Sequence, residues 1–117
     1  MIRTAIFFCA VCGCGLAAHA GRPFVLPLSA HVTQTSVKNG GWTEAGTIGV
    51  VFVQAEGSFK SAMAQSGWKF LHKVSLGGYN VRSLYTWRKG NRELTLMLWR
   101  IDVGKTGFSW GLAKAGK

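Results

Sequence analysis

The sequence predicts an α+β fold in which one short helix packs on an antiparallel sheet of about four to five strands. Three observations support this class. Only one segment repeats apolar residues at helical spacing, three segments alternate apolar and polar residues with the period of a strand, and glycine-containing turns separate them. The expected order of elements is β-α-β-β-β-β, within a single compact domain at residues 47–117.

Residues 21–46 are expected to form an N-terminal arm with one possible edge strand. Pro23 and Pro27 favour an extended start, because proline fixes φ and lacks a backbone N–H. Weak alternation from Ala30 to Lys38 is compatible with a strand at a sheet edge. The glycines at Asn39-Gly40-Gly41 are a strong turn signal that ends it.

Residues 47–55 are predicted to form the first central strand. This segment reads TIGVVFVQA and is rich in β-branched and aromatic residues. Its nearly continuous apolar character is typical of a strand buried on both faces.

The helix is predicted over residues 59–65. Ser58 is the expected N-cap, because its hydroxyl can accept a hydrogen bond from the free amides of the first turn. The apolar residues that share one helical face are Phe59, Ala62 and Met63. Gly67 can take the left-handed conformation that ends a helix, with Trp68 folding back onto it.

The rest of the chain alternates with period two and predicts an antiparallel meander. The strands are expected at 68–76, 79–88 and 92–102, with a short last strand at 108–112. Turns are expected at Gly77-Gly78 and at Lys89-Gly90-Asn91. By alternation, the residues packed on the helix are Trp68, Phe70, Val74, Tyr85, Trp87, Leu94, Leu96 and Leu98.

The opposite face of the meander is the candidate binding site. By alternation it carries Lys69, Lys73, Arg82, Arg88, Thr95, Met97 and Trp99. The candidate ligand-binding residues are Lys69, Lys73, Arg82, Arg88 and Trp99, because cationic groups attract an anion while the indole stacks on a sugar or base. The alternative is that the N-terminal segment covers Met97, Trp99 and Ile101 and leaves only a charged rim.

Residues 1–20 are expected to be a signal peptide that is cleaved on export. A positive start at Arg3 precedes an apolar run from Thr4 to Leu16, and Ala18-His19-Ala20 supplies the small residues of a cleavage site. The run is shorter than the roughly 20 apolar residues of a membrane-spanning helix. The alternatives are a lipoprotein leader anchored at Cys14 and a buried N-terminal helix.

The sequence predicts that the exported domain lacks cysteine and carries a large positive charge. All three cysteines lie in the leader, at Cys9, Cys12 and Cys14, so the mature chain can form no disulfide and use no thiol. The whole chain carries a net charge of +10. Without Arg3, thirteen basic residues face four acidic ones, a net charge of +9. Such a field favours anionic partners, although charge can also serve solubility alone.

No catalytic, cofactor or metal motif is predicted. Gly104-Lys105-Thr106 resembles the end of a phosphate-binding loop, but Trp99 stands where that loop needs its first glycine. His31 and His72 are far apart in the sequence, and none of the carboxylates has a spacing typical of a catalytic pair or metal site. The acidic residues are Glu44, Glu56, Glu93 and Asp102.

The function predicted from these features is that of an exported, non-enzymatic binding module of the bacterial envelope. Its basic, aromatic-bearing sheet face would bind an anionic surface or polymer or an envelope protein, in the periplasm or outside the cell. Nucleic acid is a less favoured ligand. The alternative is an accessory or inhibitor protein that docks on an envelope protein through a strand edge. A small hydrolase is a third hypothesis.

Overall fold

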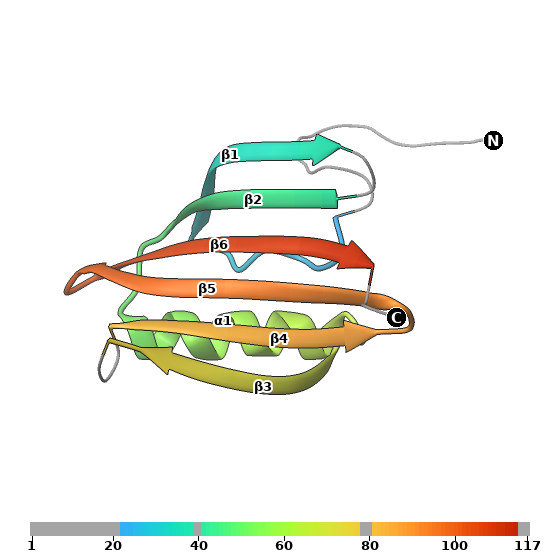
Figure 1. Ribbon diagram of the computed structural model, residues 1–117. Coiled ribbons are helices and arrows are strands. Elements are labelled where there is room, and N and C mark those ends of the chain that lie inside the picture. Colours follow the sequence, from blue (N-terminus) through green and yellow to red (C-terminus); the bar gives the residue numbers. More distant parts are fainter. Residues whose placement is uncertain (1–21, 39–40, 78–80, 115–117) are drawn as a thin grey trace.

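The computed structural model describes residues 22–38, 41–77 and 81–114, which form one helix packed on one antiparallel sheet (Figure 1). The strands are β1 (Ala30–Lys38), β2 (Gly41–Ile48), β3 (Lys69–Leu76), β4 (Arg82–Lys89), β5 (Arg92–Asp102) and β6 (Lys105–Lys114), and the helix is α1 (Phe52–Gln65). The predicted α+β class with one helix on an antiparallel sheet is confirmed. The expected signal peptide at residues 1–20 lies outside the described residues.

The described sheet has six strands rather than four to five, and the element order is β-β-α-β-β-β-β. The hairpin β1–β2 comprises residues 30–46, predicted as part of an arm with a possible edge strand, and residues 47–48, predicted as the start of a central strand. This hairpin joins the sheet because β2 pairs antiparallel with β6, so that the spatial order is β1-β2-β6-β5-β4-β3. The last strand of the chain is therefore central, and β1 and β3 are the two edges.

The helix begins earlier than the sequence predicts. Residues 47–55 are not one strand, because β2 ends at Ile48 and α1 begins at Phe52 after a bend. Ser58 lies inside the helix, and the N-cap is Val51, which provides no side-chain cap. The buried helix residues are Phe52, Ala55, Phe59 and Met63. Burial of this continuous apolar face outweighs the strand preference of the β-branched residues, since tertiary packing supplies most helix stability.

The helix ends where the sequence predicts, at Gln65, with Gly67 just beyond it. Gly67 has a φ of 85°, a conformation that glycine adopts without steric cost. Its amide donates to Ala64 O at 3.1 Å and the amide of Trp68 donates to Met63 O at 3.0 Å, which together form a Schellman motif. Trp68 is buried, and its indole Nε1 donates to Pro23 O at 2.9 Å. The helix end therefore also fixes the segment that precedes β1.

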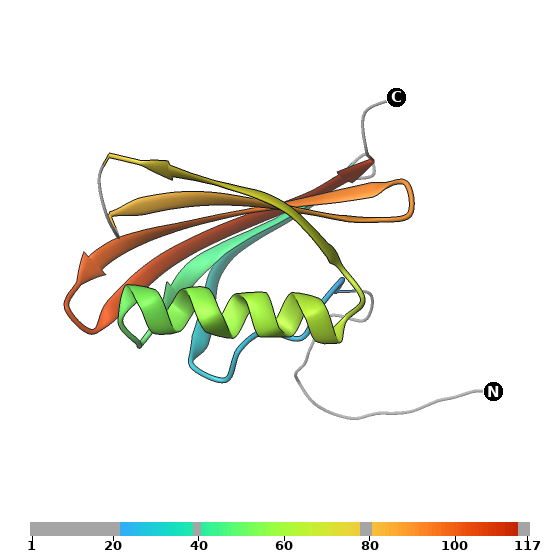
Figure 2. The same cartoon turned by 90° about the horizontal axis from the view of Figure 1, so that it is seen from below.

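Residues 22–29, which we call the arm, lie beside α1 on the same side of the sheet (Figure 2). Phe24 is buried and contacts the rings of Phe59 and Trp110, with centroids 6.2 and 5.2 Å away. Arg22 forms two hydrogen bonds with the buried carboxylate of Glu44, at 3.0 and 2.8 Å. The helix and the arm thus cover the same face of the sheet, and that face holds the hydrophobic core.

Candidate binding face

The sheet face opposite α1 and the arm, here called the outer face, is covered by neither of them (Figure 2). Strand pairing arranges its residues in three rows that cross all six strands from β3 to β1. The rows are Leu76, Arg82, Trp99, Gly107, Thr47 and His31; Val74, Leu84, Met97, Ser109, Ala45 and Gln34; and His72, Thr86, Thr95, Gly111, Thr43 and Ser36. A shorter fourth row holds Lys69, Arg88, Glu93 and Ala113.

A β-bulge in β3 changes which residues reach the outer face. The pairing of β3 with β4 shifts between Phe70 and His72, so Leu71 is the extra residue. An extra residue reverses the alternation beyond it. Val74 is therefore on the outer face and 45% exposed, and its predicted place in the core is wrong. Phe70 keeps the helix face, where its ring contacts Trp87, but it is 43% exposed.

Four of the five predicted site residues lie on the outer face, in two pairs at opposite ends of β4. Arg82 is directly opposite Trp99, and Lys69 is directly opposite Arg88. Arg88 also forms a long ion pair with Glu93, with 3.8 Å between nitrogen and oxygen. Lys73 is the exception, because the bulge turns it to the helix face opposite Tyr85. Its predicted place on the outer face is wrong.

Trp99 is half-buried because its indole lies across the neighbouring strand. Gly107, its partner on β6, is buried beneath the ring, and a Cβ at that position would collide with the indole. The indole thus covers the glycine while remaining partly open to solvent. The predicted alternative placed the N-terminal segment over Met97 and Trp99. The described part of that segment, residues 22–29, lies instead on the helix face.

Lys73 takes part in a polar cluster between α1 and β3. The Glu56 carboxylate accepts hydrogen bonds from Lys73 Nζ and Tyr85 Oη, both at 2.7 Å. Burial raises the pKa of Glu56, but these two hydrogen bonds and the charges of Lys73 and Lys60 outweigh it, so the pKa lies below 4.5. Burial, the hydrogen bond and the negative charge of Glu56 raise the pKa of Tyr85. Glu56 is thus an ionised acceptor, and the cluster ties the helix to β3 through Lys73 and to β4 through Tyr85.

A shallow hollow of about 550 Å³ lies over β1, β2 and β6 on the outer face. The outer-face residues that line it are Gln34, Ser36, Thr43, Ala45 and Ser109. Thr35 and Glu44 also border it, but their side chains point to the helix face, where Thr35 Oγ1 donates to the Glu44 carboxylate at 3.0 Å. The sequence did not predict this hollow, because residues 34–45 were assigned to the N-terminal arm expected at 21–46 and Ser109 to a separate last strand. The sequence feature that could have indicated this polar surface is the run of hydroxyl and amide residues in β1.

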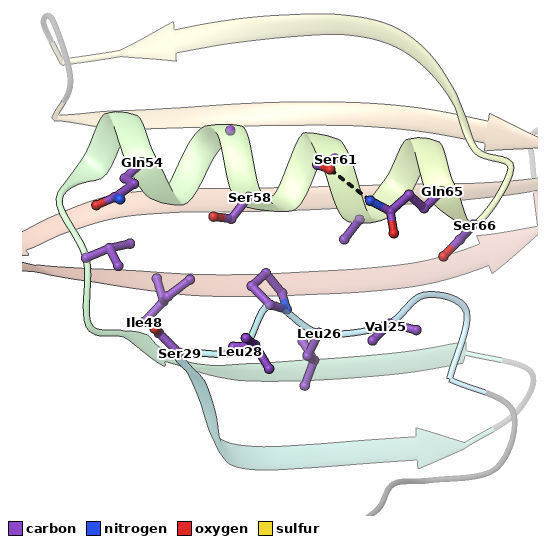
Figure 3. A pocket seen from close by; sticks show the side chains of 14 residues that line it. Val25, Leu26, Leu28, Ser29, Ile48, Gln54, Ser58, Ser61, Gln65 and Ser66 are labelled. Carbon is purple, nitrogen blue, oxygen red and sulfur yellow. Dashed lines mark hydrogen bonds between the residues drawn. The ribbon is translucent and has the colours of Figure 1, made fainter.

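A second depression, a groove of about 990 Å³, lies on the helix side between the arm and α1 (Figure 3). The arm contributes Val25, Leu26 and Leu28, and the helix contributes Ser58 and Ser61 with neighbouring glutamines. None of the described residues that line the groove is charged. The Lys and Arg residues that give the protein its excess positive charge therefore do not line this groove.

The described residues contain no group of three His, Cys, Asp or Glu side chains placed to hold a metal ion. Within the same residues, α1 is neither long nor apolar enough to cross a membrane. Comparison with known protein families, with curated proteins and with solved structures gave no match.

Proposed function

We propose that the protein is an exported, non-enzymatic binding module whose outer face binds an anionic polymer of the bacterial envelope. The observation that carries the proposal is the pairing on this face. Arg82 lies directly opposite the partly exposed Trp99, and the like charges Lys69 and Arg88 face each other. Like charges directly opposite each other destabilise a sheet. Glu93, opposite Arg88 on β5, offsets only part of that repulsion. An anionic ligand would offset the rest, and a ligand at Arg82 would find a flat contact surface on the Trp99 indole.

The distribution of acidic side chains also supports an anionic ligand. Three of the four carboxylates in the described residues, those of Glu44, Glu56 and Glu93, are held in ion pairs. Glu44 is buried, and Glu56 is half-buried against Tyr85. The surface therefore retains a large excess of Lys and Arg, which attracts polyanions over distances up to the screening length.

Export is part of the proposal and rests on the sequence of residues 1–20. A cleaved leader would leave a mature chain without cysteine, located in the periplasm or outside the cell. A positively charged binding face suits that location, because acidic polysaccharides and anionic lipid headgroups are accessible there.

A second candidate is an accessory or inhibitor protein that docks through an edge strand. The observation that favours it is the exposure of apolar residues on the free strand β3, where Phe70, Leu71, Val74 and Leu76 are 37–45% exposed. We rank it below the first candidate, because β3 and β1 each carry a register shift, at Leu71 and Thr33. Bulges are a common device by which proteins prevent pairing at free edges.

Salt dependence distinguishes the two candidates. The protein expressed from the full chain would be titrated with acidic polysaccharide, anionic vesicles and DNA over a series of salt concentrations. We expect polyanion binding that weakens steeply with salt. Arg82→Ala should weaken it about threefold to fivefold. The matched variant Arg100→Ala removes the same charge from a neighbouring strand and should have less effect, because Arg100 lies outside the outer-face rows.

Absence of polyanion binding at low salt would overturn the proposal. Binding that Arg82→Ala and Arg100→Ala weaken equally would also overturn it, because only the total charge would then matter. Salt-insensitive binding to an envelope protein that is lost when β3 is altered would establish the second candidate instead.

A further inference from the structure

The hollow on β1, β2 and β6 offers uncharged hydrogen-bonding groups to a ligand. The polar outer-face side chains that line it are Gln34, Ser36, Thr43 and Ser109, and the first three of these are exposed. Glu44 brings no charge to the hollow, because its side chain is fully buried and paired with Arg22. Hydroxyl and amide groups both donate and accept hydrogen bonds. This chemistry suits ligand hydroxyls rather than ligand anions.

Trp99 lies between this hollow and the basic strands. Its indole leans from β5 over Gly107 on β6, toward the side of the sheet that holds the hollow. From β5 to β2 is two strand spacings, or about 10 Å. Ser109 also lies one row along the strands from Trp99, and Thr43 lies two rows along, so these residues are about 8 and 17 Å from Trp99. A sugar chain that stacks one ring on Trp99 and crosses the sheet obliquely therefore brings its following rings over Ser109 and Thr43.

The cationic groups lie on the other side of Trp99. Arg82 is its direct neighbour on β4, and Arg88 lies six residues further along the same strand, about 20 Å away. Across the strands the outer face thus offers cations, then an aromatic ring, then hydroxyls and an amide. A lipid headgroup or polyphosphate would use only the cations. Single-stranded nucleic acid would use the cations and the indole, but its phosphates would gain nothing from the uncharged hollow.

We infer that the ligand of the outer face is an acidic polysaccharide whose chain crosses β4, β5, β6 and β2. One carboxylate pairs with Arg82, one sugar ring stacks on Trp99, and the hydroxyls of the following rings bind in the hollow. This inference deepens the proposed function and rests on it, because both use the outer face. It adds the class of polymer and a set of residues that carry no charge.

Removal of the hollow's hydroxyls tests the inference without changing the charge. The full-length protein with Thr43→Val and Ser109→Ala would be titrated with polygalacturonate, a chain of carboxylate-bearing sugars, and with polyphosphate, which has no sugar. We expect about tenfold weaker binding of polygalacturonate and unchanged binding of polyphosphate. The matched control is Ser58→Ala with Ser61→Ala, which removes two hydroxyls from the groove on the opposite side of the molecule. This control should leave both affinities unchanged.

Trp99→Leu provides a second measurement, since leucine retains an apolar cover over Gly107 but has no flat ring. We expect it to weaken polygalacturonate binding about tenfold and to leave polyphosphate binding nearly unchanged.

The outcomes separate this inference from the proposed function. If no polyanion binds at low salt, the proposed function itself fails. If polyphosphate, phosphatidylglycerol vesicles or single-stranded DNA bind at least as tightly as polygalacturonate, and the hydroxyl variant changes nothing, the proposed function stands and the polysaccharide assignment is wrong.

Discussion

The two faces of the sheet are built from alternate residues of the same strands, yet they differ sharply in packing. On the helix face Phe59, Tyr85 and Trp110 have at most 1% of their surface exposed. On the outer face Thr95, Met97 and Trp99 are only half-buried. Antiparallel sheets commonly bury one face and leave the other to solvent. The difference indicates that the helix face provides stability, which leaves the outer face available for contact with a ligand.

The largest expected effect is on the helix face. Phe59→Ala removes a fully buried ring that contacts Phe24 and Phe108, and we expect a loss of about 3–5 kcal/mol in the free energy of unfolding. Met97→Ala on the outer face should cost much less, because Met97 is only partly buried. Urea denaturation of both variants measures the contrast. Equal losses would contradict the division of the sheet into a core face and a contact face.

An intermediate effect is expected on the outer face, where the Trp99 indole rests on Gly107. Gly107→Ala places a methyl group against the indole of Trp99 and should destabilise the protein by about 1–3 kcal/mol. The double variant Gly107→Ala, Trp99→Ala should cost less than the two single losses added together, because the collision is absent. Denaturation of the four proteins in this cycle gives the coupling. Additive losses would show that the indole does not rest on Gly107.

The smallest expected effect concerns the cluster at Glu56, between helix and sheet. Because folding lowers the pKa of Glu56 below 4.5, its contribution to stability is present above that pH and is lost as the pH falls through the folded value. Glu56→Gln should therefore lower stability slightly at neutral pH and flatten the fall in stability below about pH 4.5. Thermal melting at several pH values measures this. An unchanged acid profile would show that the cluster contributes nothing to stability.

Alternation and turn chemistry predicted the part of the fold that local sequence controls. Leu94, Leu96 and Leu98 are buried as expected, because a regular strand places every second residue on one face. Gly67 ends the helix as expected, because few other residues adopt a positive φ at low cost. The positions of Arg82, Arg88 and Trp99 on one face follow from the same period.

The predictions from the sequence were wrong where a contact between residues distant in sequence determines the local structure. Phe52 begins a helix inside a segment with strand preference, since its ring is buried in the shared core. The bulge at Leu71 reverses the second half of β3, so Lys73 reaches Glu56 instead of the outer face. The hollow formed only because β2 pairs with β6, which brings Thr43 near Ser109. No local pattern specifies that pairing.

Local sequence was enough to predict the α+β class, the central alternating strands, the helix end and the excess of positive charge. These properties depend on residue type and on periods of two or 3.6 residues, which neighbours in the chain fix. Long-range packing set the strand order, the start of the helix and the set of residues that share the outer face. These depend on strand register and on burial between segments far apart in sequence, where a shift of one residue moves a side chain to the opposite face.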